Sequence, residues 1–322
     1  MTTANQQVVE RNMRSFVRVL SVSFLALVLT GASAGPVAAQ PAPVSAALVA
    51  PGGRVTDVDS QSGGVTMTTT KQQVVALLKS IETGEAAPVA VINPSHYTQH
   101  NLGAADGLAG FGALLQALPK GSARVNTRRV FQDGNFVFTH TEYNFFGPKI
   151  GFDIFRFEKG QVVEHWDNLQ QTPDKPNPSG HTMTDGPTQA ADLEKTEANK
   201  ALVRSFVDQI LVNGRMDRLA GFFDGDRYVQ HNPQIGDGLS GLGAALAAMA
   251  KQGITMKYDR IHQVLGEGNF VLVVSEGQLG GRSSSFYDLF RVEKDKIAEH
   301  WDTIEAIPPR AEWKNQNGKF GF

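Results

Sequence analysis

The 322-residue sequence predicts an α+β protein with two tandem domains, each an antiparallel sheet packed against helices that precede it. Two observations predict this fold. The chain contains an internal repeat at an offset of 131 to 135 residues, and within each copy the helical patterns come before the strand patterns. Helices followed by consecutive strands favour α+β over a doubly wound parallel sheet. The length agrees, because about 150 residues is a usual domain size.

The repeat consists of two pairs of matching segments. Residues 97–101 (Tyr-Thr-Gln-His-Asn) match residues 228–232 (Tyr-Val-Gln-His-Asn), and an Asp-Gly-Leu triplet follows each. Residues 153–167 match residues 288–302 at nine of fifteen positions, where average residue usage would give about one. Both of these longer segments end in Glu-His-Trp-Asp. The sequence therefore predicts a duplicated domain.

The first 39 residues are predicted to be a signal peptide. Three arginines precede an apolar stretch at 19–30, and small residues with cleavage sites between Ala34 and Ala39 follow. The apolar stretch has twelve residues, which is short of the roughly 20 that span a bilayer. We therefore expect an exported protein, periplasmic or secreted, without stable membrane insertion after processing. An N-terminal membrane anchor is the alternative.

The other boundaries follow the composition of the chain. Residues 40–70 are rich in Pro, Ala, Gly, Ser and Thr without an apolar period, which predicts a flexible lead-in. A Pro/Gly-rich stretch at 172–196 predicts a linker. It separates a first domain at 71–171 from a second domain at 197–322, which ends in a C-terminal tail.

Helical spacing of apolar residues predicts a first helix at 71–82 and at 197–212, each followed by a glycine that ends it. A second helix is predicted at 108–118 and at 239–249. Alternating patterns then predict strands. Their order is 130–142, the strand of Asp153 and the strand of Asp167 in the first copy, and 264–276, the strand of Asp288 and the strand of Asp302 in the second.

The composition excludes several kinds of chemistry. Without cysteine the chain has no disulfide, thiol nucleophile or thiolate-bound metal. Its net charge of −2 gives no electrostatic reason to expect nucleic acid. Residues 103–112 lack the glycine spacing of a phosphate-binding loop, and no Gly-x-Ser-x-Gly elbow is present. We therefore expect no cofactor, and catalysis would come from carboxylates, imidazoles or hydroxyls.

The last two strands of each copy form a predicted hairpin that brings acidic and imidazole side chains together. A three-residue loop ending at Gly160 places Asp153 opposite His165. Because side chains alternate along a strand, Asp167 lies on the same face. The same register in the second copy gives the matching set Asp288, His300 and Asp302.

Such a His/Asp site can remove and return a proton at neutral pH, since an apolar wall raises the pKa of one carboxyl while the other stays ionised. The alternative is that Asp, His and Trp only tie down the hairpin and fill the core. A metal bound by His100, Asp153 and neighbouring groups is a weaker hypothesis, because the chain has no His-Glu-x-x-His spacing. We therefore expect no metal.

Other polar residues are candidates for the walls of the two pockets. His100 and His231 precede an Asp-Gly turn, and they either rim a pocket or cap a loop. Glu142 is in phase with His140, so we expect it to point inward. The second copy has Val274 at the position of His140, which would make the second pocket less polar. The candidate substrate-binding residues are Tyr97, His100, Asn101, His140, Glu142 and Trp166 in the first copy, and Tyr228, His231, Asn232, Glu276 and Trp301 in the second.

These motifs resemble those of the SnoaL-like polyketide cyclases of the nuclear transport factor 2 superfamily. The resemblance rests on Asp-hydrophobic-Phe-Arg-Phe/Val-Glu-Lys, Glu-His-Trp-Asp, Tyr-x-Gln-His-Asn and Asp-Gly-Leu, and it covers 71–171 and 197–307. It implies two cone-shaped domains, each a curved antiparallel sheet with a mostly apolar pocket between sheet and helices. It also implies that the two domains pair sheet to sheet within the chain.

In the cyclases of this family, a pocket Asp acts as acid/base in a cofactor-free intramolecular aldol ring closure. The resemblance gives this role to Asp167 and Asp302. The groups that would assist by hydrogen-bonding the enolate are Asp153, His165, Asp288 and His300.

Three functional hypotheses follow from the sequence. The first is an exported, cofactor-independent cyclase, lyase or isomerase for a small hydrophobic carbonyl compound, with the first copy as the main candidate. The second is a non-catalytic periplasmic carrier of a small hydrophobic molecule. The third is a structural module that pairs through the sheet face carrying Trp166.

Overall fold

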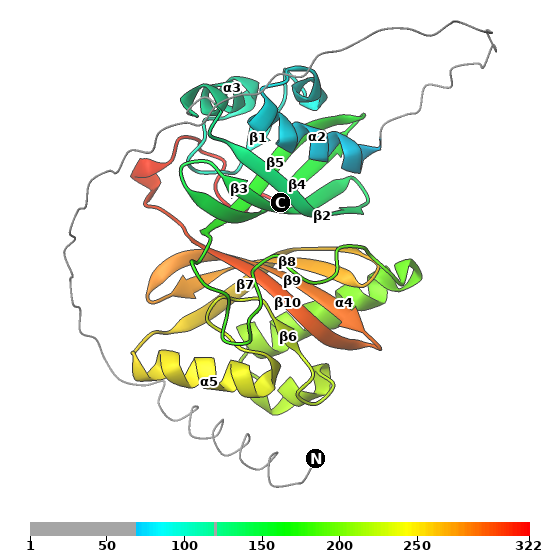
Figure 1. Cartoon of the computed structure of the whole chain (residues 1–322), viewed down its shortest axis with the longest axis vertical. Coiled ribbons are helices and arrows are strands. Elements are labelled where there is room, and N and C mark those ends of the chain that lie inside the picture. The colour runs from blue at the N-terminus through cyan, green and yellow to red at the C-terminus, as the bar shows by residue number, and fades with distance from the viewer. Residues whose placement is uncertain (1–68, 119–120) are drawn as a thin grey trace, which may run out of the picture.

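The computed structural model describes residues 69–118 and 121–322, which form two α+β domains (Figure 1). The predicted signal peptide and all but the last two residues of the predicted lead-in lie outside the described residues. No helix in the described part of the chain has the length and apolar character needed to span a membrane. The first domain consists of α2 (Thr70–Thr83), a 3-10 helix (Ala87–Val91), β1 (Thr98–Gln99), α3 (Gly107–Ala117), β2 (Arg124–Asp133), β3 (Phe136–Asn144), β4 (Pro148–Glu158) and β5 (Gln161–Gln171).

The second domain has a closely similar order of elements. Its first helix, α4 (Thr196–Phe206), continues as a π-helical segment (Val207–Val212), and the other predicted helices agree with the structure within two residues at each end. Short 3-10 helices lie at Leu193–Lys195, Met216–Phe222 and Arg310–Glu312. The remaining elements are β6 (Val229–Gln230), α5 (Gly238–Lys251), β7 (Met256–Glu267), β8 (Phe270–Leu279), β9 (Arg282–Glu293) and β10 (Lys296–Ala306).

Both sheets are five-stranded and open, with the orders β1-β5-β4-β3-β2 and β6-β10-β9-β8-β7. The four long strands of each sheet are antiparallel, whereas the short strands β1 and β6 lie parallel to β5 and β10. The predicted α+β class is therefore confirmed, and each sheet is mixed at one edge rather than wholly antiparallel.

Each run predicted as one long strand is in fact part of a hairpin. The run at 130–142 turns at Gly134, whose φ is 57°, and the run at 264–276 turns at Gly268, whose φ is 59°. Only two residues separate the paired strands, so the apolar alternation continues almost unbroken across the turn. The single-strand prediction is wrong for this reason.

The β4–β5 hairpin closes with a two-residue turn instead of the predicted three-residue loop. Lys159 and Gly160 have φ values of 49° and 80°, as a type I′ turn requires. A bulge next to the turn then sets Asp153 opposite Asp167 rather than opposite His165. The predicted register is wrong by two residues. Because the error is even, every side chain keeps its predicted face.

The β9–β10 hairpin repeats this geometry. Lys294 and Asp295 have φ values of 52° and 57°, so Asp takes the left-handed position that Gly160 takes in the first domain. Asp288 pairs with Asp302 and not with His300. The corrected register therefore holds in both domains.

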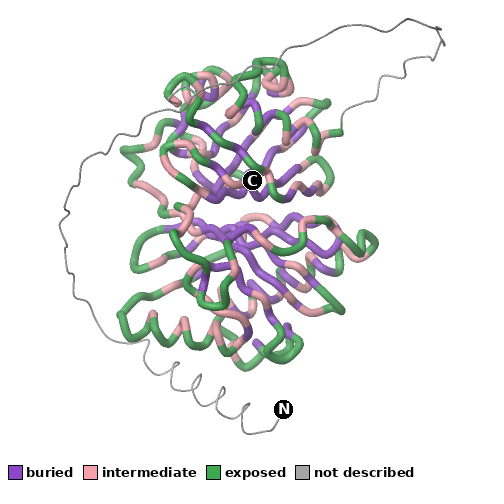
Figure 2. The backbone as a smooth tube through the Cα atoms, in the orientation of Figure 1, coloured by how far each residue is buried: buried purple, intermediate pink, exposed green. Residues whose placement is uncertain are grey.

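The two sheets pack face to face, and Figure 2 shows buried segments on both sides of this contact. Phe131 stacks on Phe270 across it, with ring centroids 4.6 Å apart. Asn168 donates a hydrogen bond from Nδ2 to the carbonyl of Thr303 on the other sheet, at 2.8 Å. The inter-sheet layer comprises Phe131, Phe138, Phe152, Ile154, Trp166, Leu265, Phe270, Leu272, Val274, Tyr287, Leu289 and Trp301.

The opposite face of each sheet packs on helices. In the first domain Leu77 and Leu78 of α2 join Val137 and Phe155 in one apolar cluster. A corresponding cluster in the second domain contains Phe206 and residues of β7 to β10. Both faces of each sheet are therefore buried, so the alternation of apolar residues along a strand does not show which face lies toward the helices.

The linker crosses from the first domain onto the second. Nδ2 of Asn177 donates to the carbonyls of Gln230 at 2.5 Å and Ile235 at 3.0 Å, beside the short strand β6. Arg129, which lies on β2, donates to the linker carbonyls of Asp185 at 2.5 Å and Pro187 at 2.8 Å. The linker is thus held by groups from both domains.

The C-terminal tail, residues 307–322, crosses in the opposite direction, so the C-terminus lies against the first domain (Figure 1). Nδ2 of Asn315 donates to the carbonyls of Asn101 at 2.7 Å and Ala104 at 3.0 Å. The segments Asn-Pro-Ser-Gly at 177–180 and Asn-Gln-Asn-Gly at 315–318 occupy matching places, and both glycines have positive φ. Each domain therefore receives the extension that follows the other domain.

Candidate active site

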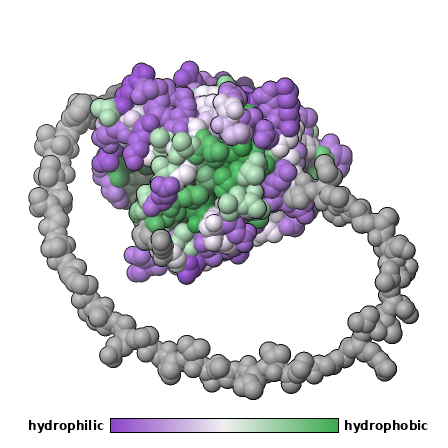
Figure 3. Space-filling model, turned by 90° about the horizontal axis from the view of Figure 1, so that it is seen from above, coloured by the Kyte–Doolittle hydropathy of each residue, from purple (hydrophilic) through white to green (hydrophobic). Residues whose placement is uncertain are grey.

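A cavity of about 80 Å³ lies between the helices and the sheet of the first domain. Figure 3 looks down on the end of this domain that carries α2 and α3, and an apolar area occupies the middle of that face. Polar groups enter the cavity from β1, β3, β4 and β5. The apolar part of the wall includes Leu77, Leu78, Ile81, Phe111, Leu114 and Phe155.

Both ring nitrogens of His165 face oxygen acceptors. Nδ1 lies 3.0 Å from Oε1 of Gln99, and Nε2 lies 3.2 Å from Oδ1 of Asp153. The backbone N–H of Asn101 donates to the same Gln99 oxygen at 2.8 Å, which identifies that atom as an acceptor. Nδ1 of His165 therefore carries a hydrogen, and one further proton is shared between Nε2 and Asp153.

Asp153 also accepts a hydrogen bond at its second oxygen. The hydroxyl of Tyr143 donates to Oδ2 at 2.6 Å. Burial, together with the neighbouring charge of Asp153, raises the pKa of Tyr143 well above its usual value. Burial likewise raises the pKa of Tyr97, which also lines the cavity. Both tyrosines therefore remain hydrogen-bond donors at neutral pH.

Asp167 has one carboxylate oxygen that accepts no hydrogen bond. Oδ2 accepts from Nδ2 of Asn101 at 2.5 Å. Oδ1 is buried, and no described residue donates a hydrogen bond to it. Buried acceptors are nearly always hydrogen-bonded, so this exception needs an explanation. An acceptor without a donor can receive a hydrogen bond or a proton from a guest in the cavity.

The cation that balances Asp167 comes from the C-terminal tail. Lys319 is buried, and its Nζ lies 3.6 Å from Oδ1 of Asp167 and 2.5 Å from Oε2 of Glu305. Burial lowers the pKa of Lys319, but the carboxylates of Glu305 and Asp167 outweigh that effect, so the pKa is raised. Lys319 therefore stays charged beside the site.

The second domain repeats the His/Asp arrangement. Nδ1 of His300 lies 2.9 Å from Oε1 of Gln230, and Nε2 lies 3.1 Å from Oδ1 of Asp288. Nδ2 of Asn232 donates to Oδ2 of Asp302 at 2.7 Å. Oδ1 of Asp302, like that of Asp167, is buried without a donor among the described residues.

The tyrosine that contacts Asp153 in the first domain and the one that contacts Asp288 in the second come from different strands. The hydroxyl of Tyr258, on β7, lies 3.2 Å from Oδ1 of Asp288, whereas Tyr143 is on β3. Tyr258 pairs with Gly277 across the sheet, and Tyr143 pairs with Val125. A Cβ at Gly277 would lie 2.0 Å from a backbone oxygen, so no second tyrosine fits there.

The carboxyl groups of Asp167 and Asp302 lie in different environments. Within the described residues, no lysine or arginine forms an ion pair with Asp302, whereas Lys319 pairs with Asp167. Burial raises the pKa of Asp302 to about 6, although His300 and Asn232 partly oppose the shift. Near neutral pH this carboxyl can both give and take a proton.

The raised pKa of Asp302 predicts that Asp302→Asn stabilises the protein above pH 6. The folded protein keeps the proton up to about pH 6, whereas the unfolded chain releases it near pH 3.8. Ionisation therefore costs the wild type stability as the pH rises between these values. The variant should gain about 3 kcal/mol at pH 7 and little at pH 4, as measured by urea unfolding at both pH values. A gain of equal size at the two pH values would contradict this assignment.

The structure brings five of the predicted first-domain residues into the cavity: Tyr97, Asn101, Asp153, His165 and Asp167. Asn232 contacts Asp302 in the second domain, and the hydroxyl of Tyr228 accepts from Nε2 of Gln230 at 3.3 Å. These two residues therefore lie beside the second His/Asp set.

The other predicted substrate-binding residues lie on the opposite face of each sheet. His100 stacks on Trp166 with centroids 4.7 Å apart, and His140 stacks on Phe152 at 4.3 Å. Glu142 accepts a hydrogen bond from the linker residue Thr184 at 2.5 Å. The prediction that Glu142 and His140 point into the pocket is wrong. Since both sheet faces are buried, alternation alone could not show which face holds the cavity.

The same correction applies to the second domain. His231 stacks on Trp301 with centroids 4.6 Å apart, and Glu276 lies 3.0 Å from Nε2 of His262. Val274 belongs to the inter-sheet layer, so its difference from His140 does not change the polarity of either pocket.

Sequence reasoning missed several residues of the sites. Gln99 and Gln230 occur in both copies of Tyr-x-Gln-His-Asn, so the repeat carried a signal for them. Tyr143 and Tyr258 carried none, because they occupy different positions in the two copies. Lys319 carried none either, because it lies in the tail of the other domain.

The two sets of Asp, His and Asp are also close enough to share a cation, because one ligand atom from each residue lies within 4.8 Å of the others. Each imidazole already hydrogen-bonds through both of its nitrogens. These polar atoms, apart from one oxygen each of Asp167 and Asp302, are therefore satisfied by the protein alone.

Comparison with known protein families gives a match for the second domain. Residues 203–300 match the family model described as SnoaL-like domain, a range that runs from α4 to His300. The second domain is a SnoaL-like domain. This confirms there the resemblance inferred from the motifs. No curated protein shows significant similarity to the chain.

Solved structures that are similar include an NTF2-like protein of unknown function from Cytophaga hutchinsonii, at 15% identity and a TM-score of 0.29, covering 33% of this chain and 95% of that chain. IdmH, a candidate polyketide cyclase from Streptomyces antibioticus, is 15% identical with a TM-score of 0.27, covering 30% of this chain and 89% of its own. A candidate ketosteroid isomerase from Kribbella flavida is 19% identical with a TM-score of 0.29, covering 36% of this chain and 84% of its own.

Proposed function

We propose that the chain is a cofactor-independent enzyme that performs acid/base chemistry on a small hydrophobic carbonyl compound, as an aldol-type cyclase, lyase or isomerase. The observation that carries the proposal is the free oxygen Oδ1 of Asp167 in a largely apolar cavity. Oδ1 accepts no hydrogen bond from a described residue, and its only ion-pair partner there, the Lys319 ammonium, lies 3.6 Å away. A buried acceptor without a hydrogen bond costs stability, and a role as proton acceptor supplies a reason for it. The SnoaL-like domain is compatible with this chemistry.

In the proposed reaction, Oδ1 of Asp167 removes a proton from the carbon next to the substrate carbonyl. The enolate oxygen that forms accepts a hydrogen bond from the hydroxyl of Tyr97, whose raised pKa keeps it protonated. The proton shared by His165 and Asp153 leaves this pair without net charge, so it does not repel the developing enolate. Asp167 then returns its proton to another carbon of the enolate. In the aldol branch, the enolate carbon attacks a second carbonyl, and Asp167 gives its proton to the alkoxide oxygen that forms.

The size of the cavity limits the substrate. Its volume of about 80 Å³ is well below the roughly 300–1,000 Å³ of sites for drug-sized ligands. The proposal therefore concerns a compact carbonyl compound in the first domain. In the second domain, Asp302 has the same free oxygen and a pKa of about 6, which suits a general base.

The test is exchange of α-protons of cyclohexanone in deuterated water, followed by NMR with the buffer rate subtracted. Asp167→Asn should lower the rate by about 10²–10⁴-fold if the first domain is active, and Asp302→Asn should do so for the second. Asp217→Asn, an exposed control on the 3-10 helix Met216–Phe222, should exchange at the wild-type rate.

Equal exchange by the wild type and by the folded double variant Asp167→Asn/Asp302→Asn would overturn the proposal. A small hydrophobic molecule that co-purifies in native mass spectrometry, without any turnover, would favour the carrier hypothesis instead.

We also propose that the protein is exported, periplasmic or secreted. The support is the pattern of residues 1–39, in which three arginines precede a short apolar stretch. Fractionation with N-terminal sequencing should find a mature chain that begins after Ala34 or Ala39. A full-length chain in the membrane fraction would favour the anchor.

A further inference from the structure

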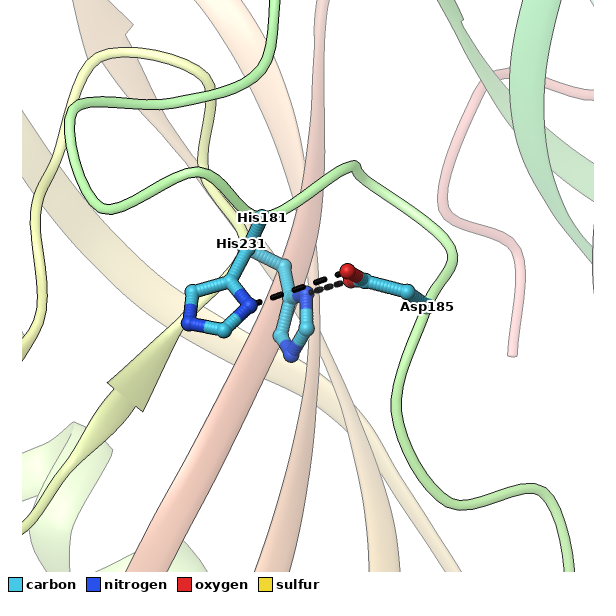
Figure 4. A group of neighbouring side chains, drawn as sticks. All are labelled: His181, Asp185 and His231. Carbon is cyan, nitrogen blue, oxygen red and sulfur yellow. Dashed lines mark ion pairs between the residues drawn. The ribbon is translucent and has the colours of Figure 1, made fainter.

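A group of histidine and acidic side chains lies outside both His/Asp sites, where the linker crosses the SnoaL-like domain. His181 and Asp185 belong to the linker, and His231 follows β6 (Figure 4). Nδ1 of His231 lies 2.6 Å from Oδ1 of Asp185, and Nδ1 of His181 lies 3.6 Å from Oδ2. In Figure 4 both imidazoles turn this nitrogen toward the carboxylate.

The other nitrogen of each imidazole faces a different carboxylate. Nε2 of His231 lies 2.8 Å from Oε1 of Glu299, and Nε2 of His181 lies 3.1 Å from Oδ2 of Asp237. A proton on each Nε2 satisfies these contacts and leaves both Nδ1 lone pairs directed at Asp185. Histidines that bind metals have this arrangement, with the second ring N–H donated to a carboxylate that orients the ring.

The short approach of His231 to Asp185 requires a hydrogen atom or a metal ion between them. Glu299, Asp185 and the carbonyl of Thr182, at 2.8 Å, all present acceptors to the two nitrogens of this buried ring. Oδ1 of Asp185 is itself buried and accepts no hydrogen bond from any described residue. A metal ion on Nδ1 would satisfy Asp185 and leave the hydrogen of the ring on Nε2, facing Glu299.

The protein holds Asp185 in this place through groups from both domains. Arg129 donates to the backbone carbonyls of Thr184 at 3.1 Å and Asp185 at 2.5 Å. The guanidinium lies 4.2 Å from the centre of the Trp301 ring, and Nε1 of Trp301 donates to the Asp185 carbonyl at 3.0 Å. The linker segment that carries two of the three ligand-type side chains is therefore fixed before any ion binds.

The first domain provides an internal comparison. His100 corresponds to His231, and its ring nitrogens lie 3.0 Å from Glu164 and 2.8 Å from the carbonyl of Gly318 in the tail. In the matching turn of the tail, Lys319 takes the place of His181. No Asp185 equivalent forms an ion pair with His100 among the described residues. Among the described residues, the first domain thus lacks the His181 ligand that the SnoaL-like domain has.

We propose that His181, Asp185 and His231 bind a divalent transition metal ion of the zinc type. Two imidazole nitrogens and one carboxylate oxygen form a usual zinc set, with a fourth position for water or the Thr182 carbonyl. One ligand atom from each of the three residues lies within 4.8 Å of the others, so small side-chain movements bring all of them to bonding distance. The bound ion fastens the linker to the SnoaL-like domain, and this role does not depend on the proposed enzyme activity.

The test is a calorimetric titration of the chelator-treated full chain with ZnCl₂. We expect one site whose affinity falls at least about 10-fold in His181→Ala and in Asp185→Asn. Asp237→Asn removes the negative charge behind His181, keeps an oxygen that can accept from the Gln230 backbone N–H, and should weaken zinc about 10–100-fold. His96→Ala, an exposed histidine of the first domain, is the matched control and should bind zinc as the wild type does.

Two further measurements keep the test decisive. His165→Ala and His300→Ala should leave this zinc affinity unchanged, which separates the linker site from the two His/Asp sites. Zinc should also raise the melting temperature of the wild type and not that of His181→Ala. Wild-type affinity and stoichiometry in folded His181→Ala, or no binding to the wild type, would overturn the proposal and leave a hydrogen bond between His231 and Asp185 as the explanation of their contact.

Discussion

Replacing Trp301 with alanine is expected to lower the free energy of unfolding by about 3–5 kcal/mol. Trp301 is fully buried in the inter-sheet layer, where it stacks on His231 and lies under the guanidinium of Arg129. Alanine would leave a cavity between two sheets that cannot close it without moving relative to each other. Urea unfolding followed by circular dichroism measures the loss.

The matching tryptophan of the first domain provides the control. Nε1 of Trp166 donates to no acceptor among the described residues, whereas Nε1 of Trp301 donates to the Asp185 carbonyl at 3.0 Å. Trp301→Phe should therefore cost about 1 kcal/mol more than Trp166→Phe. A loss below about 1 kcal/mol for Trp301→Ala would contradict the buried contact between the sheets.

Removal of residues 313–322 should destabilise the protein by about 3 kcal/mol or more, because several buried contacts are lost together. Asn315 forms two hydrogen bonds to backbone carbonyls of the first domain, and Lys319 forms ion pairs with Glu305 and Asp167. Phe322 stacks on Trp166 with ring centroids 4.4 Å apart. Differential scanning calorimetry of the truncated and full-length chains measures the effect.

Single substitutions separate these contributions. Asn315→Ala should cost about 2 kcal/mol through its two hydrogen bonds, and Asn177→Ala, the matching change in the linker, should cost a similar amount. Lys319→Met leaves Asp167 and Glu305 without their buried cation, so it should destabilise more at pH 7 than at low pH. An unchanged melting temperature after truncation would show that the tail does not pack on the first domain in solution.

Much of the fold was accessible from the sequence because it depends on local patterns. Helical periods at 71–82 and 108–118 and the repeated Glu-His-Trp-Asp strands predicted the order of elements. The face of each side chain in the last hairpin was predicted correctly, because the real and predicted registers differ by an even number of residues. The register was not, because a two-residue turn plus a bulge and a three-residue loop give the same parity, so Asp153 faces Asp167 instead of His165.

The site was only partly accessible for a related reason. Asp153, His165 and Asp167 share a face in any even register, so the sequence placed them together. His140 and Glu142 were assigned to the wrong face because the second sheet buries the outer face as thoroughly as the helices bury the inner one. A pattern of apolar residues indicates that a face is buried, but it does not show whether helices or a second sheet cover that face.

By itself, the sequence determined the class of fold, the repeated halves and the residues that share a strand face, since each follows from local spacing. Tertiary structure alone decided that Asp167 receives a lysine. It also decided that His181 and Asp185 meet His231. These contacts join residues as far apart in the chain as Asp167 and Lys319, and they arise because each domain binds the segment that follows the other. Spacing along a chain carries no information about such crossings, which depend on how two folded surfaces fit together.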